Sequence, residues 1–326
     1  MLPTRRAALA ASFALAAAAP SARAAAAWPE KPVRLVVPFI GGSSTDTIAR
    51  VLALRLGEEL GQNIVVDNRA GTGGLLAAHT VQRAEPDGYT LLFSGAGLLH
   101  IRHLQREAGF EPLRDFTPVA RVVTNSAVCC VPADRPWRNV ASLVAAARSG
   151  SPSGLAYGSG GVGTPAHLAG AALLKLSDAP GIHVPYNGAN QATLALARGE
   201  VDFAFAIANI ALPYIRDGRF RPLVYAGGRR NNALPEVPSF PEAVPGAPAV
   251  ENWSAIFGPA GLPAPVVERL DHAVQAVGRR ADFAGAMARD GNEVFLSESP
   301  EALRAFMAQE HESIGRLVRL AGASRE

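Results

Sequence analysis

Cysteine is almost absent from this chain of 326 residues: Cys129 and Cys130 are the only two, and they are adjacent. Two neighbouring cysteines cannot staple a fold through a disulfide framework or build a zinc site by themselves. A disulfide between adjacent residues needs a strained geometry, so we expect both thiols to stay reduced and buried in a strand. After the first thirty residues no apolar run approaches the roughly 20 residues that cross a bilayer, which predicts a soluble body.

Lysine is scarce as well, with only Lys31 and Lys175. The formal net charge of +3 equals the three arginines of the first 24 residues, which contain no acid, so the rest of the chain is balanced. A protein that binds nucleic acid needs clustered Lys and Arg on one face. The composition therefore argues against a nucleic-acid partner.

Constellations for catalysis are also lacking. No serine lies in the G-x-S-x-G frame of a nucleophile elbow. His100 and His103 could face one metal, but no carboxylate or Cys is expected to complete a ligand set, so surface histidines are the expectation. The glycines of 158–163 match G-x-G-x-x-G, but no acidic residue ends the following strand to bind a ribose. We therefore predict no catalytic residue, no metal and no cofactor.

The amino terminus has the pattern of an export signal. Arg5 and Arg6 precede an apolar stretch over 7–19 that is too short to span a membrane, and Ala22-Arg23-Ala24 fits a small-x-small cleavage site. We predict that residues 1–24 are a signal peptide and that the mature protein is periplasmic. The arginine pair is compatible with either ordinary secretion or twin-arginine export.

The mature chain alternates between strand and helix patterns, and its length suits two domains. β-branched runs at 33–39, 64–66 and 90–93 are separated by helical spacing over 45–60 and 75–83. A second series follows, with strands at 155–157, 182–184 and 201–207. This order predicts an α/β fold with parallel sheets covered by helices. The proline-rich stretch 235–265 is expected to be an extended connection.

Four segments place glycine or small polar residues directly after a predicted strand: 41–45, 71–74, 94–97 and 158–164. The carboxyl ends of parallel strands share one edge, where ligands bind. Three of these loops run into helices, whose free N–H groups favour an anion. Because the loops carry no Lys or Arg apart from a flanking Arg69, we expect a carboxylate to be held by backbone donors and hydroxyls.

Several motifs, in this order and spacing, resemble the Bug-type periplasmic solute-binding proteins of tripartite tricarboxylate transporters. They are Trp28-Pro29-Glu30-Lys31-Pro32, Val66-Asp67-Asn68-Arg69-Ala70-Gly71, Pro86-Asp87-Gly88-Tyr89, Gly163-Thr164-Pro165-Ala166-His167, Val184-Pro185-Tyr186-Asn187-Gly188 and Leu234-Pro235-Glu236-Val237-Pro238. The resemblance covers nearly the whole mature chain. One departure is the pair Ser43-Ser44, whose extra hydroxyls either add donors or narrow the pocket.

The resemblance implies a two-lobed periplasmic binding protein of the type II, Venus-flytrap architecture, with a mainly parallel sheet in each lobe and two crossover strands. The first lobe is expected over 25–129 plus 253–326 and the second over 130–252. The two lobes would close on a small organic acid, one carboxylate of which lies between the loops 39–43 and 158–164. Membrane transporter subunits are the implied partners, and the protein is expected to be a monomer.

The sequence thus nominates eleven ligand-binding residues. They are Phe39, Gly42, Ser43, Asp46, Ser94, Ser159, Gly160, Gly163, Thr164, His167 and Asp202. Asp46 could instead accept the free N–H groups of its helix or pair with Arg50, and Asp202 lies either on an exposed face or in the cleft. Two functions stay open: a carboxylate receptor for transport or sensing, and an exported hydrolase on the same scaffold.

Overall fold

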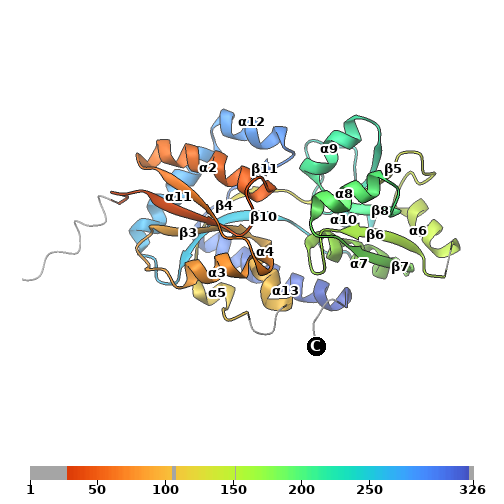
Figure 1. The fold of residues 1–326 in the computed structure, drawn as a ribbon, viewed down its shortest axis with the longest axis horizontal. Coiled ribbons are helices and arrows are strands. Elements are labelled where there is room, and N and C mark those ends of the chain that lie inside the picture. The colour runs from red at the N-terminus through yellow and green to blue at the C-terminus, as the bar shows by residue number, and fades with distance from the viewer. Residues whose placement is uncertain (1–27, 105–107, 151, 323–326) are drawn as a thin grey trace, which may run out of the picture.

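A computed structural model describes residues 28–104, 108–150 and 152–322. Its strands form two separate sheets, which lie side by side along the longest axis of the molecule (Figure 1). The predicted signal peptide, residues 1–24, lies outside the described residues.

The first sheet has six strands in the order β11-β4-β10-β3-β1-β2. Four of them, β1 to β4, run in one direction, and β10 and β11 run against them. The bounds are β1 Val33–Val37, β2 Ile64–Asn68, β3 Thr90–Gly95, β4 Phe116–Thr124, β10 Trp253–Pro259 and β11 Glu293–Val294.

The second sheet has five strands in the order β7-β6-β8-β5-β9. Here β5 alone runs against the other four. The bounds are β5 Ala127–Pro132, β6 Leu155–Ser159, β7 Gly181–Pro185, β8 Phe203–Ile207 and β9 Phe220–Tyr225. The predicted fold, two α/β lobes with mainly parallel strands, is confirmed, and the strands that oppose the majority include β5 and β10, which follow the two crossings.

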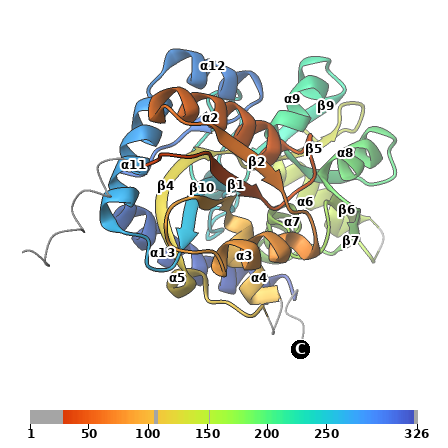
Figure 2. The same cartoon turned by 60° about the vertical axis from the view of Figure 1, so that its left-hand side comes forward.

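Helices cover both faces of each sheet. Figure 2 shows α2, α11 and α12 on one face of the first sheet and α3, α5 and α13 on the other. The helices are α2 Ser44–Leu60, α3 Leu75–Gln82, α4 Ala96–Leu104, α5 Pro112–Asp115, α6 Val140–Ser149, α7 Pro165–Leu176, α8 Ala189–Ala197, α9 Ala208–Arg216, α10 Phe240–Ala243, α11 Ala264–Gly278, α12 Ala281–Arg289 and α13 Pro300–Leu320, with a 3₁₀ turn η1 at Thr72–Gly74. Among the described residues, no helix is long and apolar enough to cross a membrane.

The alternating pattern of β1 explains why the sheet is covered twice. Val33, Leu35 and Val37 pack into the core beneath α2 and α11, while Val36 points into the core on the opposite face. Successive side chains of a strand point to opposite sides, so a run without polar residues needs apolar partners on both. A strand that is apolar on both faces is therefore typical of an α/β fold, in which helices cover the sheet on both sides.

One continuous core joins the two lobes. It contains Leu98 of α4 and Met307 of α13 from the first lobe, and Leu168 of α7 and Phe203 of β8 from the second. Helix α13 contacts both α4 and α7, and in Figure 1 it lies below the junction of the lobes. Burial of apolar surface between the lobes stabilises this arrangement.

The chain passes between the sheets at a polar joint. It leaves β4 after Thr124 and enters β5 at Ala127, and it returns through Asn252 into β10. β5 pairs with β8 and β9 from Ala127 on, so the sheets divide the chain at residues 125–126, a few residues before the predicted boundary at 129. The buried cysteines, both free, lie within β5 as expected.

The proline-rich stretch 235–265 is not the plain extended connection that its sequence predicts, so this prediction is wrong. It contains the short helix α10 and the central strand β10, which is buried along its whole length. The prolines lie outside the paired part of this strand or at its last residue, Pro259, so they remove no ladder hydrogen bond from its interior. The many prolines belong to the turns on either side of β10. They obscure the apolar pattern from which the strand between them could have been predicted.

Candidate functional site

The loop that follows β1, residues 39–43 and here called the β1 loop, is held by the carboxylate of Asp46. This side chain is 3% exposed and accepts hydrogen bonds from Gly42 N (2.8 Å), Arg50 Nε (2.9 Å) and Asn68 Nδ2 (2.9 Å). The Ser43 hydroxyl caps helix α2 by accepting from Asp46 N (3.2 Å). Burial disfavours the charge of Asp46, but the hydrogen bonds from Arg50, Gly42 and Asn68 outweigh it and lower its pKa.

Two donors of the β1 region are therefore already used inside the protein. The Gly42 amide points at Asp46, and the Asn68 amide donates both to Asp46 and to the Phe39 carbonyl oxygen (2.9 Å). The Phe39 side chain itself is 42% exposed. Of the alternatives raised by the sequence, Asp46 takes that of a partner of Arg50. The backbone N–H that it accepts is that of Gly42, which precedes the helix, so its contacts make it the residue that shapes the loop.

The loop that follows β6, residues 158–164 and here called the β6 loop, is held by neutral groups. Thr164 caps helix α7, donating to the Gly161 carbonyl oxygen (2.8 Å) and accepting from His167 N (3.3 Å). His167 Nδ1 in turn accepts from the Gly163 amide (3.0 Å). Gly160 lies so close to the backbone of Ala189 that a Cβ would approach its nitrogen to 2.8 Å, so only glycine fits there.

A serine–histidine pair lies at the start of this loop, although no sequence motif predicts a nucleophile next to a base. Ser159 Oγ lies 2.7 Å from His183 Nε2 and also donates to the Gly161 carbonyl oxygen (3.0 Å). The two residues come from the adjacent parallel strands β6 and β7. Ser159 is fully buried, and burial together with His167, which stacks on it, lowers the pKa of His183 to about 4.

The two lobes meet at the carboxyl ends of their strands. A hydrogen bond joins His100 of α4 to the backbone of Gly163. A Cβ on Gly163 would approach Leu104 Cδ1, on the same helix α4, to 2.2 Å, so the β6 loop packs tightly against the first lobe. On the other side, Asn209 Nδ2 of α9 donates to Ser44 Oγ at the start of α2 (3.1 Å).

The electrostatics of this junction are those of neutral donors. Burial of His100, a residue expected at the surface, lowers its pKa to about 4 with a smaller contribution from His103, and His167 and His183 have lowered pKa values too. These rings are therefore uncharged at pH 7. Nearby, Arg50 is paired with Asp46 and Arg69 with Asp67. That backbone amides and hydroxyls hold a carboxylate at this junction stays a prediction.

Other nominated residues are placed differently. Ser94 lies near the end of β3 and is 8% exposed. Asp202 lies at the amino end of β8, where it accepts from Ala156 N (3.0 Å) and faces Arg135 (3.6 Å). This is the edge of the second sheet opposite the β6 loop, so the structure does not bring Asp202 to the other candidates. The alternation of buried and outward side chains along the strand could not reveal this. It shows on which face of the sheet a side chain lies, but not which end of the strand meets the other lobe.

Asn209 is a residue at the junction of the lobes that the sequence did not nominate. It is the second residue of α9, directly after the carboxyl end of β8. The same topological rule that singled out the other loops applies to it, but no glycine-rich turn separates β8 from α9. The sequence offered one signal for Asn209: it is a polar residue that lies two positions after the end of the strand β8.

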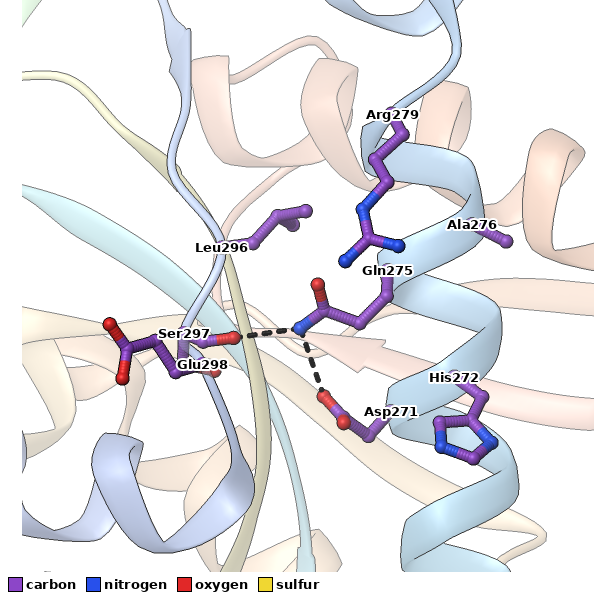
Figure 3. Close-up of a pocket in the computed structure, with 8 residues that line it drawn as sticks. All are labelled: Asp271, His272, Gln275, Ala276, Arg279, Leu296, Ser297 and Glu298. Carbon is purple, nitrogen blue, oxygen red and sulfur yellow. Dashed lines mark hydrogen bonds between the residues drawn. The ribbon is translucent and has the colours of Figure 1, made fainter.

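A separate pocket of about 750 Å³ lies on the first lobe, between α11 and residues 296–298 (Figure 3). None of the eleven nominated residues lines it. Gln275 joins its two walls, donating to Asp271 Oδ1 (3.3 Å) and to the Ser297 carbonyl oxygen (2.7 Å). Among the described residues, no group of three or more His, Cys, Asp or Glu side chains could hold a metal ion.

Two α/β lobes, joined by crossing strands and meeting through the loops at their strand ends, define a periplasmic binding protein. The family model described as "Tripartite tricarboxylate transporter family receptor" matches residues 48–322. This chain belongs to that family.

Similar proteins agree with this assignment. The "UPF0065 protein in tcbD-tcbE intergenic region" of Pseudomonas sp. (strain P51) is 35% identical over 294 residues, which are 90% of this chain and 87% of that protein. The periplasmic binding protein BugD is 30% identical with a TM-score of 0.77, covering 92% of this chain and 100% of BugD.

Two of the similar solved structures contain organic acids. R. palustris Rpa4515 with adipate is 30% identical with a TM-score of 0.79, covering 90% of this chain and 98% of that one. MatC from Rhodopseudomonas palustris with bound malate is 28% identical with a TM-score of 0.75, covering 89% and 100%. Bug-type solute-binding proteins are thus what this chain is similar to, in sequence and in fold.

Proposed function

We propose that this protein is a periplasmic receptor that captures a small organic carboxylate between its lobes. It would be exported by the signal peptide 1–24, act as a monomer, and pass its ligand to the membrane subunits of a tripartite tricarboxylate-type transporter or report it to a sensor. The lobes would rotate about the joints at residues 125–126 and 252, and the hydrogen bond from Asn209 to Ser44 would form on closure.

The observation that carries this proposal is the approach of the two lobes at their strand ends, where Asn209 of α9 donates to Ser44 Oγ of α2 and Gly163 of the β6 loop packs against Leu104 of α4. Helices α2 and α7 begin at the β1 and β6 loops with capping hydroxyls, Ser43 and Thr164, and their first-turn amides favour an anion. The organic acids bound to two similar receptors support a carboxylate as the ligand.

An exported hydrolase is the second candidate, and the contact between Ser159 and His183 is the observation in its favour. Two features speak against it. Ser159 is fully buried, so a substrate carbonyl could not reach its hydroxyl without moving the β6 loop. A histidine whose pKa is lowered to about 4 is also a weak general base at neutral pH. The receptor function therefore has the stronger support.

A thermal-shift screen tests the proposal. Mono-, di- and tricarboxylates of three to eight carbons, amino acids and aromatic acids are each compared with the corresponding amide. A ligand that binds only the closed form stabilises it by about 2.7 kcal/mol at a hundredfold excess over Kd, so one acid should raise the melting temperature and its amide should not. X-ray scattering on that acid should give a smaller radius of gyration.

The salt dependence of the same binding reaction adds a second criterion. Because the expected donors are neutral and partly buried, affinity should change by less than about threefold between 0.05 and 0.5 M salt. A steep loss with salt would indicate capture by an exposed arginine instead. Turnover of an ester or amide by the purified protein, lost in Ser159→Ala, would favour the hydrolase.

A further inference from the structure

Asn209 bridges the two lobes and keeps one polar atom free. Its Nδ2 donates to Ser44 Oγ across the junction (3.1 Å). Its Oδ1 is buried and has no hydrogen-bond partner among the described residues. Because the amide nitrogen is engaged by Ser44, the oxygen is turned to the other side of the group.

A buried amide oxygen without a donor is unusual, because losing its hydrogen bonds to water costs stability. The polar groups of the adjoining β1 loop do not supply that donor. The Gly42 amide is used by Asp46, and the Asp46 amide by Ser43. A molecule that enters between the lobes can supply the donor.

We propose that Asn209 accepts a hydrogen bond from the ligand, so that this receptor prefers organic carboxylates that also carry a hydroxyl or ammonium group. The inference rests on the proposed function and names the class of acid. Fold similarity alone leaves this open, since malate carries a hydroxyl group and adipate has none. Discrimination would arise because an unsubstituted acid leaves Oδ1 buried and unpaired.

Isothermal titration with matched acids tests this preference. The series are succinate, malate and aspartate; glutarate, 2-hydroxyglutarate and glutamate; and adipate with 2-aminoadipate. Within the chain length that binds, the acid with the donor should bind about tenfold more tightly or better. The comparison of malate with aspartate, or of its longer equivalents, then tells whether the hydroxyl or the ammonium group is accepted.

Variants separate the role of Asn209 from a general effect on folding. Asn209→Leu keeps the size of the side chain but has no acceptor, so it should remove the difference within a series while the plain acid still binds. Asn190→Leu is the matched control: Asn190 is also the second residue of a helix, α8, and it is exposed. It should keep the wild-type preference. Both variants are first checked by thermal melting.

The outcomes distinguish this inference from the proposed function. Equal affinities of plain and donor-bearing acids for the wild type would overturn the role of Asn209 and leave the carboxylate receptor intact. A preference that survives Asn209→Leu would likewise place the acceptor on another residue. Binding of none of the acids, in these series or in the thermal-shift screen, would overturn both proposals.

Discussion

The β1 loop and the β6 loop occupy equivalent places, each between a parallel strand and the start of a helix, but they are held by different chemistry. The β1 loop depends on an ionised carboxylate, Asp46, which gathers an arginine, an amide side chain and a backbone N–H. The β6 loop depends on hydroxyls and neutral imidazoles, with His167 in the place that the carboxylate has in the first lobe.

This difference shows how the same geometry is reached from different residues. In both loops the glycine amide four positions before an anchoring side chain is bound by it: Gly42 by Asp46 and Gly163 by His167. A charged anchor binds its donors more strongly, and a neutral anchor leaves the junction without charge. The two loops should therefore respond differently to a methyl group added at the glycine, to loss of the charge on the anchoring side chain and to a change of pH.

The largest effect is expected from Gly163→Ala compared with Gly42→Ala. Both glycines have positive φ, +78° and +80°, which costs alanine about 1–2 kcal/mol. Gly42 has open space around it, whereas a Cβ on Gly163 would meet Leu104 Cδ1 at 2.2 Å. Gly163→Ala should therefore lose about 1–3 kcal/mol more in urea unfolding.

A double variant identifies the cause of that excess. Leu104→Ala in the Gly163→Ala background should recover part of the loss, because the clash lies with the end of the leucine side chain. Equal losses in the two single glycine variants would mean that the β6 loop does not pack against α4 in solution.

The next effect is expected from Asp46→Asn. The variant keeps the shape of the side chain but replaces an ionised acceptor of three hydrogen bonds with an amide, and we expect a loss of about 2–3 kcal/mol in unfolding free energy. Glu58→Gln, on the same helix, is the control, because its ion pairs with Arg55 and Arg280 are exposed and should matter much less. Similar losses of unfolding free energy in the two variants would mean that Asp46 stabilises the protein no more than an exposed ion pair does.

The smallest effect of a single residue concerns pH. His183 and His100 have folded pKa values lowered to about 4 by burial, whereas the unfolded value is about 6.5. Protonation therefore favours the unfolded chain as pH falls below 6.5, and stability should decrease by about 2 kcal/mol for each ring between pH 7 and 5. The pKa of Asp46 is lowered instead, so its contribution is present above its usual value near 4 and is lost only at lower pH.

Replacing the ring tests which loop is responsible. His183→Gln should reduce the slope of the stability profile between pH 6.5 and 4 by about half, because His100 still titrates there, and should leave the transition at lower pH unchanged. Urea midpoints measured at half-unit steps of pH give both regions in one series. A profile that keeps its slope in the variant would move the pH sensitivity away from the β6 loop.

Much of the fold was predictable because local patterns report burial. The apolar runs at β1, β3 and β8 and the spacing of Ile48, Leu52 and Leu56 predict strands and a helix that the structure confirms. The local pattern did not predict the strand β10, because prolines surround it; only the family resemblance implied a crossing strand there. The β1 and β6 loops could be located because glycine and hydroxyl residues cluster directly after a strand, where the backbone turns sharply and a helix begins.

The sequence by itself determined the alternation of strands and helices, the small polar loops at the strand ends and the absence of positive charge within them, since each depends on residues near one another in the chain. Only the tertiary structure decided which of those residues meet. Asp202 and Asn209 lie at the two ends of the same strand, β8, yet only Asn209 reaches the first lobe, through Ser44. Strand direction within the second sheet and the placement of one lobe against the other set that contact, and both arise from packing between residues far apart in sequence.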